Sequence, residues 1–192
     1  MSNISGAMLN ARAERVRKAN EGWWRDLETG APLRRNMGEM VMLIVSELAE
    51  AMEGHRKGLM DDKLPGRRMA EVEVADALIR CLDVAAGTGV IFGDSWTAQR
   101  MVVPENFGEG LLHLTDMVTN IYDAHCRAEA TQRAEDRERY CGRFWQVINA
   151  LLDFAQHHGL DIWGAYEEKM AYNAVRADHQ AAHRRAPGGK KY

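Results

Sequence analysis

Apolar side chains recur three or four residues apart along most of the chain, and this spacing places them on one face of an α-helix. The alternation of β-branched and aromatic residues that marks strands is almost absent. Only four prolines occur, at positions 32, 65, 104 and 187, and each lies close to a change in composition. The pattern therefore predicts an all-α protein. The expected helices span residues 5–20, 38–57, 67–86, 108–131, 134–158 and 161–182.

Length, charge and cysteine content narrow the class of protein. The 192 residues suffice for one sizeable domain, expected here over residues 1–182. The formal net charge of −3 argues against electrostatic binding of nucleic acid, and we interpret residues 183–192 as a solvated basic tail. Three scattered cysteines without a CxxC pair suit a reducing, cytoplasmic location. We expect neither a signal peptide nor a membrane span, because no apolar run approaches about 18 residues.

The helix expected at 38–57 carries carboxylates where its apolar stripe should continue. Its stripe begins with Met40 and Leu43 and continues with Glu47 and Glu50. A carboxylate on a buried face is costly unless it is paired or binds a metal ion. The basic residues of this helix lie a turn or more beyond the two glutamates. A metal site is therefore one interpretation, and the other is a solvated acidic pair, which is the usual role of a single ExxE on a helix.

The next helix repeats the arrangement with Glu73 and Asp76, again three residues apart among apolar residues. If the two helices pack antiparallel, their acidic pairs converge into a group of four carboxylates. Four like charges at short range require cations between them, and all-oxygen ligands select hard ions such as Mg²⁺ or Mn²⁺. A di-iron bundle would need ExxH pairs, which neither helix contains. The repetition therefore favours a Mg²⁺ or Mn²⁺ site over solvated acids.

Two parts of the sequence resemble each other at an offset of 70 residues. Residues 37–55 align without gaps on 107–125, and residues 82, 83, 85 and 89 are identical to those 70 positions later. Two amphipathic helices can resemble one another by chance; the alternative is a duplicated helix pair, 37–90 and a degenerate 107–158, in a four-helix arrangement. The acids do not repeat. The residues found in their place are Met117, Asn120, Arg143 and Gln146.

The acidic residues carry a resemblance to a known family. Glu47-x-x-Glu50, a spacer of 22 residues, and then Glu73-x-x-Asp76 resembles the signature of the MazG-like all-α NTP pyrophosphatase superfamily. That superfamily includes dimeric dUTPases, dCTP pyrophosphatases and phage-encoded relatives. The segments SELAEAMEGHRKG and EVADALIRCLDVA are similar to its two core helices, and NEGWW is similar to short phage forms. These motifs cover about 60 of the 192 residues.

A further motif near the C-terminus extends the resemblance. The segment EEKMAYNAVR resembles the K-x-x-x-N-x-x-R element of the family, whose positions are Lys169, Asn173 and Arg176 here. In compact members this element follows the ExxD helix closely, whereas here about 90 residues separate Asp76 from Lys169. An inserted, degenerate helix pair would account for that separation. Whether Lys169 reaches the acids of its own chain stays open at this point.

The resemblance implies a metal-dependent enzyme that cleaves a nucleoside triphosphate between its α and β phosphates, releasing a nucleoside monophosphate and pyrophosphate. It implies that the four acids are catalytic ligands of two or more Mg²⁺ or Mn²⁺ ions. It also implies that Lys169, Asn173 and Arg176, on a helix at 161–182, bind the substrate. Asn20, Trp23 and Trp24 precede the acidic helix and are candidates to bind the base, although tryptophans at a helix start more often fill a core.

The substrate and the oligomeric state are less constrained. The resemblance of the short form and the WW stretch to phage members, some of which act on dGTP, implies a purine deoxynucleotide such as dGTP, with dUTP and dCTP as alternatives. We expect a homo-oligomer, a dimer or a tetramer, because a bundle of this size leaves apolar surface to cover. Two other classes remain open: a catalytically silent nucleotide-binding regulatory bundle, and a structural helical bundle with solvated acids.

Overall fold

The computed structural model describes residues 4–93, 102–176 and 181–186. This part of the chain is helical, and its only β-type pairings are two isolated bridges. The all-α class predicted from the sequence is therefore confirmed. No described helix has both the length and the apolar character needed to cross a membrane. The helices are α1 (Gly6–Ala19), the 3-10 helix η1 (Glu21–Trp24), α2 (Met37–Lys57), α3 (Met69–Gly87), α4 (Phe107–Thr131), α5 (Ala134–His157), α6 (Ile162–Val175) and α7 (Ala181–Arg185).

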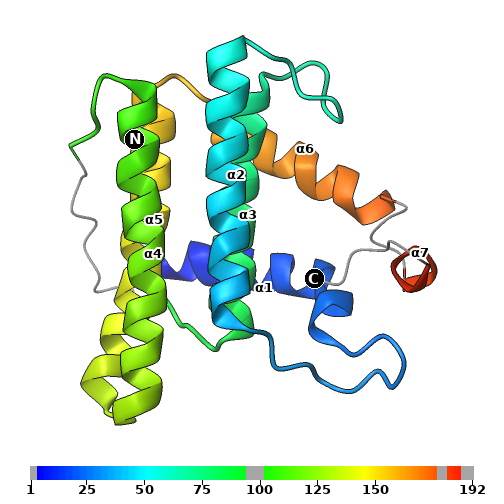
Figure 1. Cartoon of the computed structure of the whole chain (residues 1–192), viewed down its shortest axis with the longest axis vertical. Coiled ribbons are helices and arrows are strands. Elements are labelled where there is room, and N and C mark those ends of the chain that lie inside the picture. Colours follow the sequence, from blue (N-terminus) through cyan, green and yellow to red (C-terminus); the bar gives the residue numbers. More distant parts are fainter. Residues whose placement is uncertain (1–3, 94–101, 177–180, 187–192) are drawn as a thin grey trace.

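Two antiparallel helix pairs form the body of the fold (Figure 1). α2 packs on α3, α4 packs on α5, and α2 also lies beside α4. Each of the four helices contributes fully buried aliphatic side chains, among them Ile44, Leu78, Leu114 and Ile148. Burying a side chain of this size stabilises a fold by roughly 1.5–3 kcal/mol. The apolar stripes predicted from the sequence therefore meet in one core.

The two helix pairs begin in the same way at an offset of 70 residues. Asn36 and Asn106 cap α2 and α4, because the side-chain oxygen of each accepts a backbone N–H of the first turn. These bonds are 3.1 Å long from Glu39 and 3.0 Å long from Glu109. Every buried position of α4 lies 70 residues after a buried position of α2.

The two pairs also end in the same way. Gly89 and Gly159 follow α3 and α5 with φ angles of 71° and 63°, a left-handed conformation that glycine adopts without strain. The next residue in each case closes the turn, since Val90 N–H donates to the Ala85 carbonyl and the equivalent bond follows α5, both at 2.8 Å. The internal sequence similarity thus corresponds to matching caps and buried faces of α2 and α4, and to matching turns after α3 and α5.

Two further helices pack against α3, which becomes the central helix of the domain. α1 buries Leu9, Ala13 and Val16. α6 crosses on another side of α3 (Figure 1), and Arg67 fixes its start, with guanidinium nitrogens 2.7 Å from Glu71 Oε1 and 2.8 Å from Glu168 Oε1. This ion-pair network sets the position from which α6 reaches the acidic residues of α3.

The C-terminal part of the chain differs from the sequence prediction. The helix expected over 161–182 ends at Val175, and Arg176 adopts an extended conformation, with φ −66° and ψ 125°. Residues 177–180 and 187–192 of the expected helix and tail lie outside the described residues. The short α7 follows, and its Arg184 lies over the Trp23 ring at 3.6 Å and donates to the Gly22 carbonyl. The sequence contains no glycine or proline at Val175 to signal this end.

Candidate metal centre and adjoining pocket

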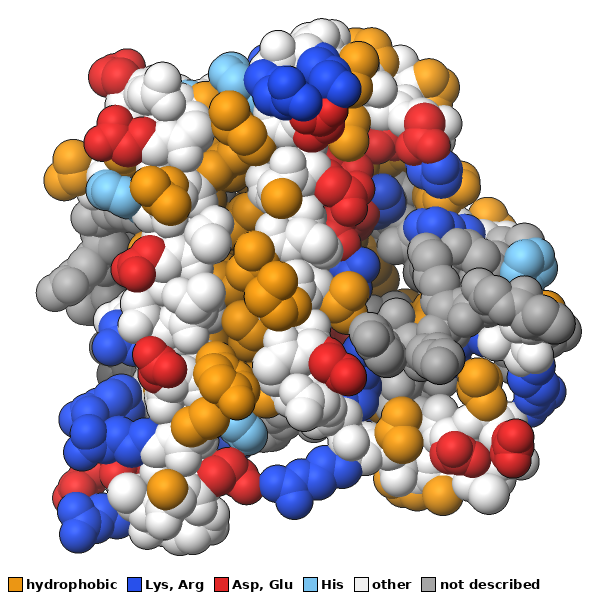
Figure 2. Space-filling model, in the orientation of Figure 1, with side chains coloured by type: hydrophobic (Ala, Val, Ile, Leu, Met, Phe, Trp, Pro, Cys, Tyr) orange, Lys and Arg blue, Asp and Glu red, His pale blue; other side chains and the backbone are white. Residues whose placement is uncertain are grey.

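Three carboxylates from two adjacent helices meet beside α6. Glu47 on α2 and Glu73 and Asp76 on α3 each offer an oxygen, and these atoms lie within 4.8 Å of one another. Glu47 and Glu73 are buried, each with 6% of its surface exposed. Glu50, the fourth acid predicted from the sequence, is exposed and lies outside this trio. Figure 2 shows acidic side chains gathered along the side of α2 that faces α6, with basic side chains next to them.

Burial changes the protonation of two of the three acids, Glu73 and Asp76. Burial raises the pKa of Glu73 to about 9, assisted by a hydrogen bond to Glu47 and by the negative charge of Asp76. Burial also raises the pKa of Asp76 to about 6, although the ammonium group of Lys169 opposes that shift. Carboxylates that retain a proton near neutral pH lack enough positive charge around them. The trio is therefore suited to gain a hard cation.

Two basic side chains partly neutralise the trio. Lys169 Nζ lies 2.7 Å from Asp76 Oδ2, and the lysine side chain is only 5% exposed. The structure thus brings Lys169 to the acids of its own chain, across the 90-residue separation in the sequence. Arg80 Nε lies 2.5 Å from Glu47 Oε1, and the arginine side chain is 39% exposed. The two cations differ in freedom, because one is enclosed and the other borders solvent.

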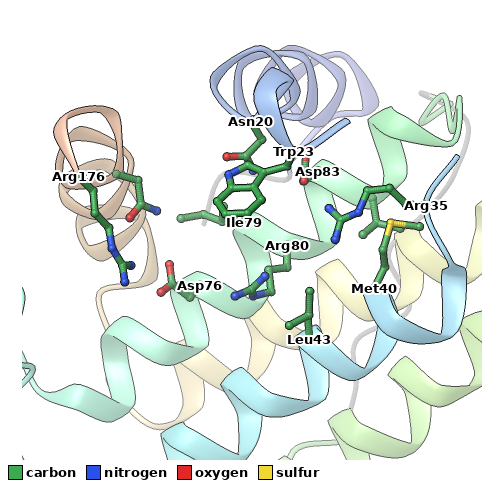
Figure 3. Close-up of a pocket in the computed structure, with 12 residues that line it drawn as sticks. Asn20, Trp23, Arg35, Met40, Leu43, Asp76, Ile79, Arg80, Asp83 and Arg176 are labelled. Carbon is green, nitrogen blue, oxygen red and sulfur yellow. The ribbon is translucent and has the colours of Figure 1, made fainter. Parts of the chain in front are cut away.

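A pocket adjoins the acidic trio and extends away from it toward η1 (Figure 3). Asp76 and Arg176 lie at one end of this pocket, Asn20 and Trp23 cover it, and Arg35 borders its other end. Its apolar wall comes from α2 and α3, and includes Met40, Leu43 and Ile79. A cavity with an aromatic ring, an apolar wall and several charged groups is typical of a small-molecule site.

The pocket contains polar atoms that lack a partner within the described part of the chain. Arg35 Nη2 and Asn173 Oδ1 are buried atoms without a hydrogen bond there, and both residues line the pocket. The first is a donor and the second is an acceptor. Buried polar atoms are normally paired, so these two atoms indicate that the pocket accommodates a polar ligand or water.

The two tryptophans of the WW stretch have different roles. Trp23 lines the pocket. Trp24 is buried, and its indole N–H donates to both oxygens of Asp83 at 3.1 and 3.2 Å. Trp24 also packs so closely on Gly87 that a Cβ there would meet its ring at 2.1 Å. Of the three base-binding candidates predicted from the sequence, Asn20 and Trp23 line the pocket, whereas Trp24 lies in the core next to it.

Asp83 is a buried acid that the sequence analysis did not select. Burial raises its pKa to about 6, although hydrogen bonds from Trp24 and Asn20 and the charges of Arg35 and Arg17 oppose that shift. By binding both Trp24 and Asn20, Asp83 holds the segment around η1 against α3. It therefore positions the residues that cover the pocket.

Arg80 and Arg35 are two further charged residues of the pocket that sequence reasoning missed. Arg80 follows Asp76 by four residues and Glu73 by seven, so helical spacing alone places it on the acidic face. That signal was available in the sequence. Arg35 lies in a loop directly before Asn36, the N-cap of α2. A loop has no helical periodicity, so the sequence does not indicate that the Arg35 side chain lines the pocket.

The second helix pair carries no acidic trio at the equivalent positions. Met117 is partly buried against the core, and it is the counterpart of Glu47. Arg143, the counterpart of Glu73, has its Nη1 atom 3.0 Å from Gln146 Oε1 on the same helix. The described contacts of Arg143 therefore lie within α5, and no described contact joins it to the acids of the first pair.

Comparison of the chain with protein-family models, with curated proteins and with solved structures finds no match. The function must therefore be argued from the trio, the pocket and the resemblance of the motifs.

Proposed function

We propose that this protein is a metal-dependent nucleoside triphosphate pyrophosphohydrolase, which converts a nucleoside triphosphate to the monophosphate and pyrophosphate. The observation that carries the proposal is the trio of Glu47, Glu73 and Asp76 within 4.8 Å, opening onto a pocket bordered by arginines and Trp23. The MazG-like resemblance of the motifs supports it. Fold and resemblance alone do not define an activity, so the activity is inferred from the residues of the site.

The donor set suits Mg²⁺ or Mn²⁺, because it consists of carboxylate oxygens alone. Glu47, Glu73 and Asp76 would hold the ion, and Glu50, exposed at the edge of the site, is proposed as a ligand of a second ion. Divalent ions at such a site neutralise phosphate charge and lower the pKa of a bound water. Ionisation of Glu73, which is protonated near neutral pH in the ion-free protein, would accompany binding.

The chain's own residues have separate tasks in this proposal. Lys169 holds Asp76 in place through the 2.7 Å ion pair. Arg176 and Arg80 border the pocket beside Asp76 (Figure 3) and would bind phosphate oxygens, which guanidinium groups do well. Trp23 would pack against the base. No serine, threonine, cysteine or histidine is among the described residues that line this pocket, and Asp76 is assigned to the ion. Direct attack by water is therefore the proposed route.

We further propose that the α4–α5 pair is a degenerate copy of α2–α3. The matching caps, turns and buried positions at an offset of 70 residues support this proposal. In this view the copy retained the packing residues and has Met117 and Arg143 where acids stand in the first pair. It would supply the core against which the acidic pair packs.

We retain the expectation of a homo-oligomer as part of the proposal. Apolar side chains lie exposed between α2 and α4 (Figure 2). The exposed large apolar residues of these two helices include Met42 and Leu112, at 61% and 66%. A second copy covering this face would remove them from water. Sedimentation equilibrium of the wild-type chain tests this directly, and a monomer at micromolar concentration would contradict it.

The test of the activity is a product assay. The full chain is incubated with each canonical dNTP and NTP in Mg²⁺ or Mn²⁺, and the products are identified by chromatography. We expect monophosphate and pyrophosphate in equal amounts, with dGTP as the first candidate substrate and dUTP and dCTP as alternatives. Stoichiometric orthophosphate would refute the cleavage site. Nucleotide binding without any turnover would favour the silent regulatory bundle instead.

A further inference from the structure

We propose that Arg80 is an exchangeable partner of Glu47: it neutralises that carboxylate while no metal ion is bound, and it binds phosphate in the adjoining pocket once an ion replaces it. The inference rests on the proposed function, because it requires a cation at the trio and an anion in the pocket. The inference adds an order of binding: the metal ion binds first and releases Arg80, which then binds phosphate.

The exposure of the two partners supports the exchange. Glu47 has a side chain only 7% exposed, whereas that of Arg80 is 39% exposed, and their atoms lie 2.5 Å apart. The acid is therefore fixed in the helix interface, and the arginine approaches it from the open side. Arg80 also lines the pocket together with Asp76. Its long side chain can leave Glu47 without leaving the site.

Lys169 provides the contrast within the same site. Its side chain is 5% exposed, it lies 2.7 Å from Asp76, and it does not line the pocket. Moving it would leave a buried ammonium group without its partner, which is strongly unfavourable. Of the two described cations that form ion pairs with the trio, Arg80 is thus the one placed to exchange.

The pocket itself indicates an anionic occupant. Arg35 and Arg80 both line it, and the positive charge of Arg80 is one cause of the lowered pKa of Arg35, after burial. Arg35 Nη2 is buried without a hydrogen bond among the described residues. Two guanidinium groups that repel one another, one of them incompletely paired, are stabilised when an anion lies between them. A polyphosphate has the charge and the oxygen acceptors that this requires.

The exchange couples the two ligands. A metal ion must compete with Arg80 for Glu47, so Arg80 weakens metal binding in the absence of nucleotide. Once displaced, the same guanidinium strengthens phosphate binding. Each ligand therefore increases the affinity for the other, and the coupling is equal in both directions because it is a property of the equilibrium.

The test compares the full-length R80Q and R127Q variants. Arg127 is a matched control, because it is an exposed arginine 2.7 Å from a buried acid, Asp136, in the second helix pair. Calorimetry measures the affinity for Mn²⁺ alone, and then the affinity for inorganic tripolyphosphate with Mn²⁺ saturating. Tripolyphosphate is the probe because it has no base.

We expect R80Q to bind Mn²⁺ about tenfold more tightly and tripolyphosphate about tenfold more weakly, each corresponding to about 1.4 kcal/mol. R127Q should change neither affinity. If R80Q does not fold, R80K carries the test: its compact charge cannot match the guanidinium geometry, and its tripolyphosphate affinity should fall.

Each other outcome overturns the inference. Unchanged or weaker Mn²⁺ binding in R80Q shows that Arg80 does not compete for Glu47. Unchanged tripolyphosphate binding in R80Q, or in R80K where that variant replaces it, shows that Arg80 does not reach phosphate. Failure of the wild type to bind Mn²⁺ removes the proposed function together with the inference, whereas the first two results leave the proposed function standing.

Discussion

The two helix pairs of this protein share a frame and differ in the polar residues placed on it. α2–α3 and α4–α5 match in their caps, in their closing turns and in the buried faces of α2 and α4. Glu47 is the one buried residue of α2 whose equivalent on α4 is not buried. That equivalent is Met117, which is partly buried. The comparison shows that the packing of such a pair does not require the acids. The packing of the pair therefore does not explain the presence of Glu47, Glu73 and Asp76.

The largest expected effect is a loss of activity when an acid of the first helix pair is replaced. Glu73→Gln should lower the rate of hydrolysis at least about a thousandfold, since it removes a ligand of an ion that contributes several kcal/mol to the reaction. Its equivalent in the second pair, Arg143→Ala, should retain most of the activity. Steady-state kinetics of both variants with saturating Mg²⁺ make the comparison. Normal activity in Glu73→Gln would remove the metal centre from this account.

Core truncations should affect the two pairs alike. Ile44 and Leu114 are equivalent, and both are fully buried. Replacing either with alanine should lower the free energy of unfolding by about 2–5 kcal/mol, the range for such truncations. Urea denaturation of the two variants measures the effect. A large loss at Ile44 with almost none at Leu114 would show that the second pair does not share the core.

The acids should give the ion-free protein a distinctive pH dependence. Folding raises the pKa of Glu73 to about 9 and that of Asp83 to about 6, so the folded state holds protons that the unfolded state releases. The stabilisation is full below pH of about 4 and is lost as pH rises toward 9. Thermal unfolding in a chelator should therefore show a melting temperature that falls between pH 5 and pH 9.

Two controls sharpen the pH prediction. Glu73→Gln should flatten the fall above pH 7, because glutamine does not ionise. Addition of Mn²⁺ should reverse it, because the ion binds the deprotonated carboxylates and stabilises the folded state. A melting temperature that rises with pH in the chelated wild type would contradict the assigned pKa shifts.

The smallest effect is expected at Met117. Its side chain is only partly buried, so Met117→Ala should cost about 1 kcal/mol, below the range for a fully buried residue. Metal affinity should be unchanged. Chemical denaturation and Mn²⁺ titration check both statements. A change in Mn²⁺ affinity would show that the second pair contributes to the metal centre.

The helical periodicity of the sequence predicts the helices and some of the residues of the site. The spacing of Glu73 and Asp76 places both on one face of their helix, and Glu47 continues the apolar stripe of its own helix. Glu50 is three residues beyond Glu47, a rotation of about 300° along the helix, and this turns it from the buried face to solvent. Whether a side chain three residues along is buried depends on the neighbouring helix, which the sequence of one helix does not specify.

Other details depended on tertiary contacts. Trp23 and Trp24 are adjacent, and only the packing of Trp24 on Gly87 and its bond to Asp83 determine which one lines the pocket. The end of α6 at Val175 has no glycine or proline to mark it, so Arg176 was assigned to a helical face that it does not occupy. Arg80, by contrast, is predictable from the sequence, because it follows Asp76 by four residues and so lies on the same helical face.

The central claim is that the first helix pair holds divalent metal ions and the second does not. Crystals of the wild-type protein grown with Mn²⁺ test it directly through the anomalous scattering of manganese. We expect an anomalous peak among the oxygens of Glu47, Glu73 and Asp76, and none beside Met117 and Arg143. A map without a peak at the trio, or with an equal peak at the second pair, would contradict it.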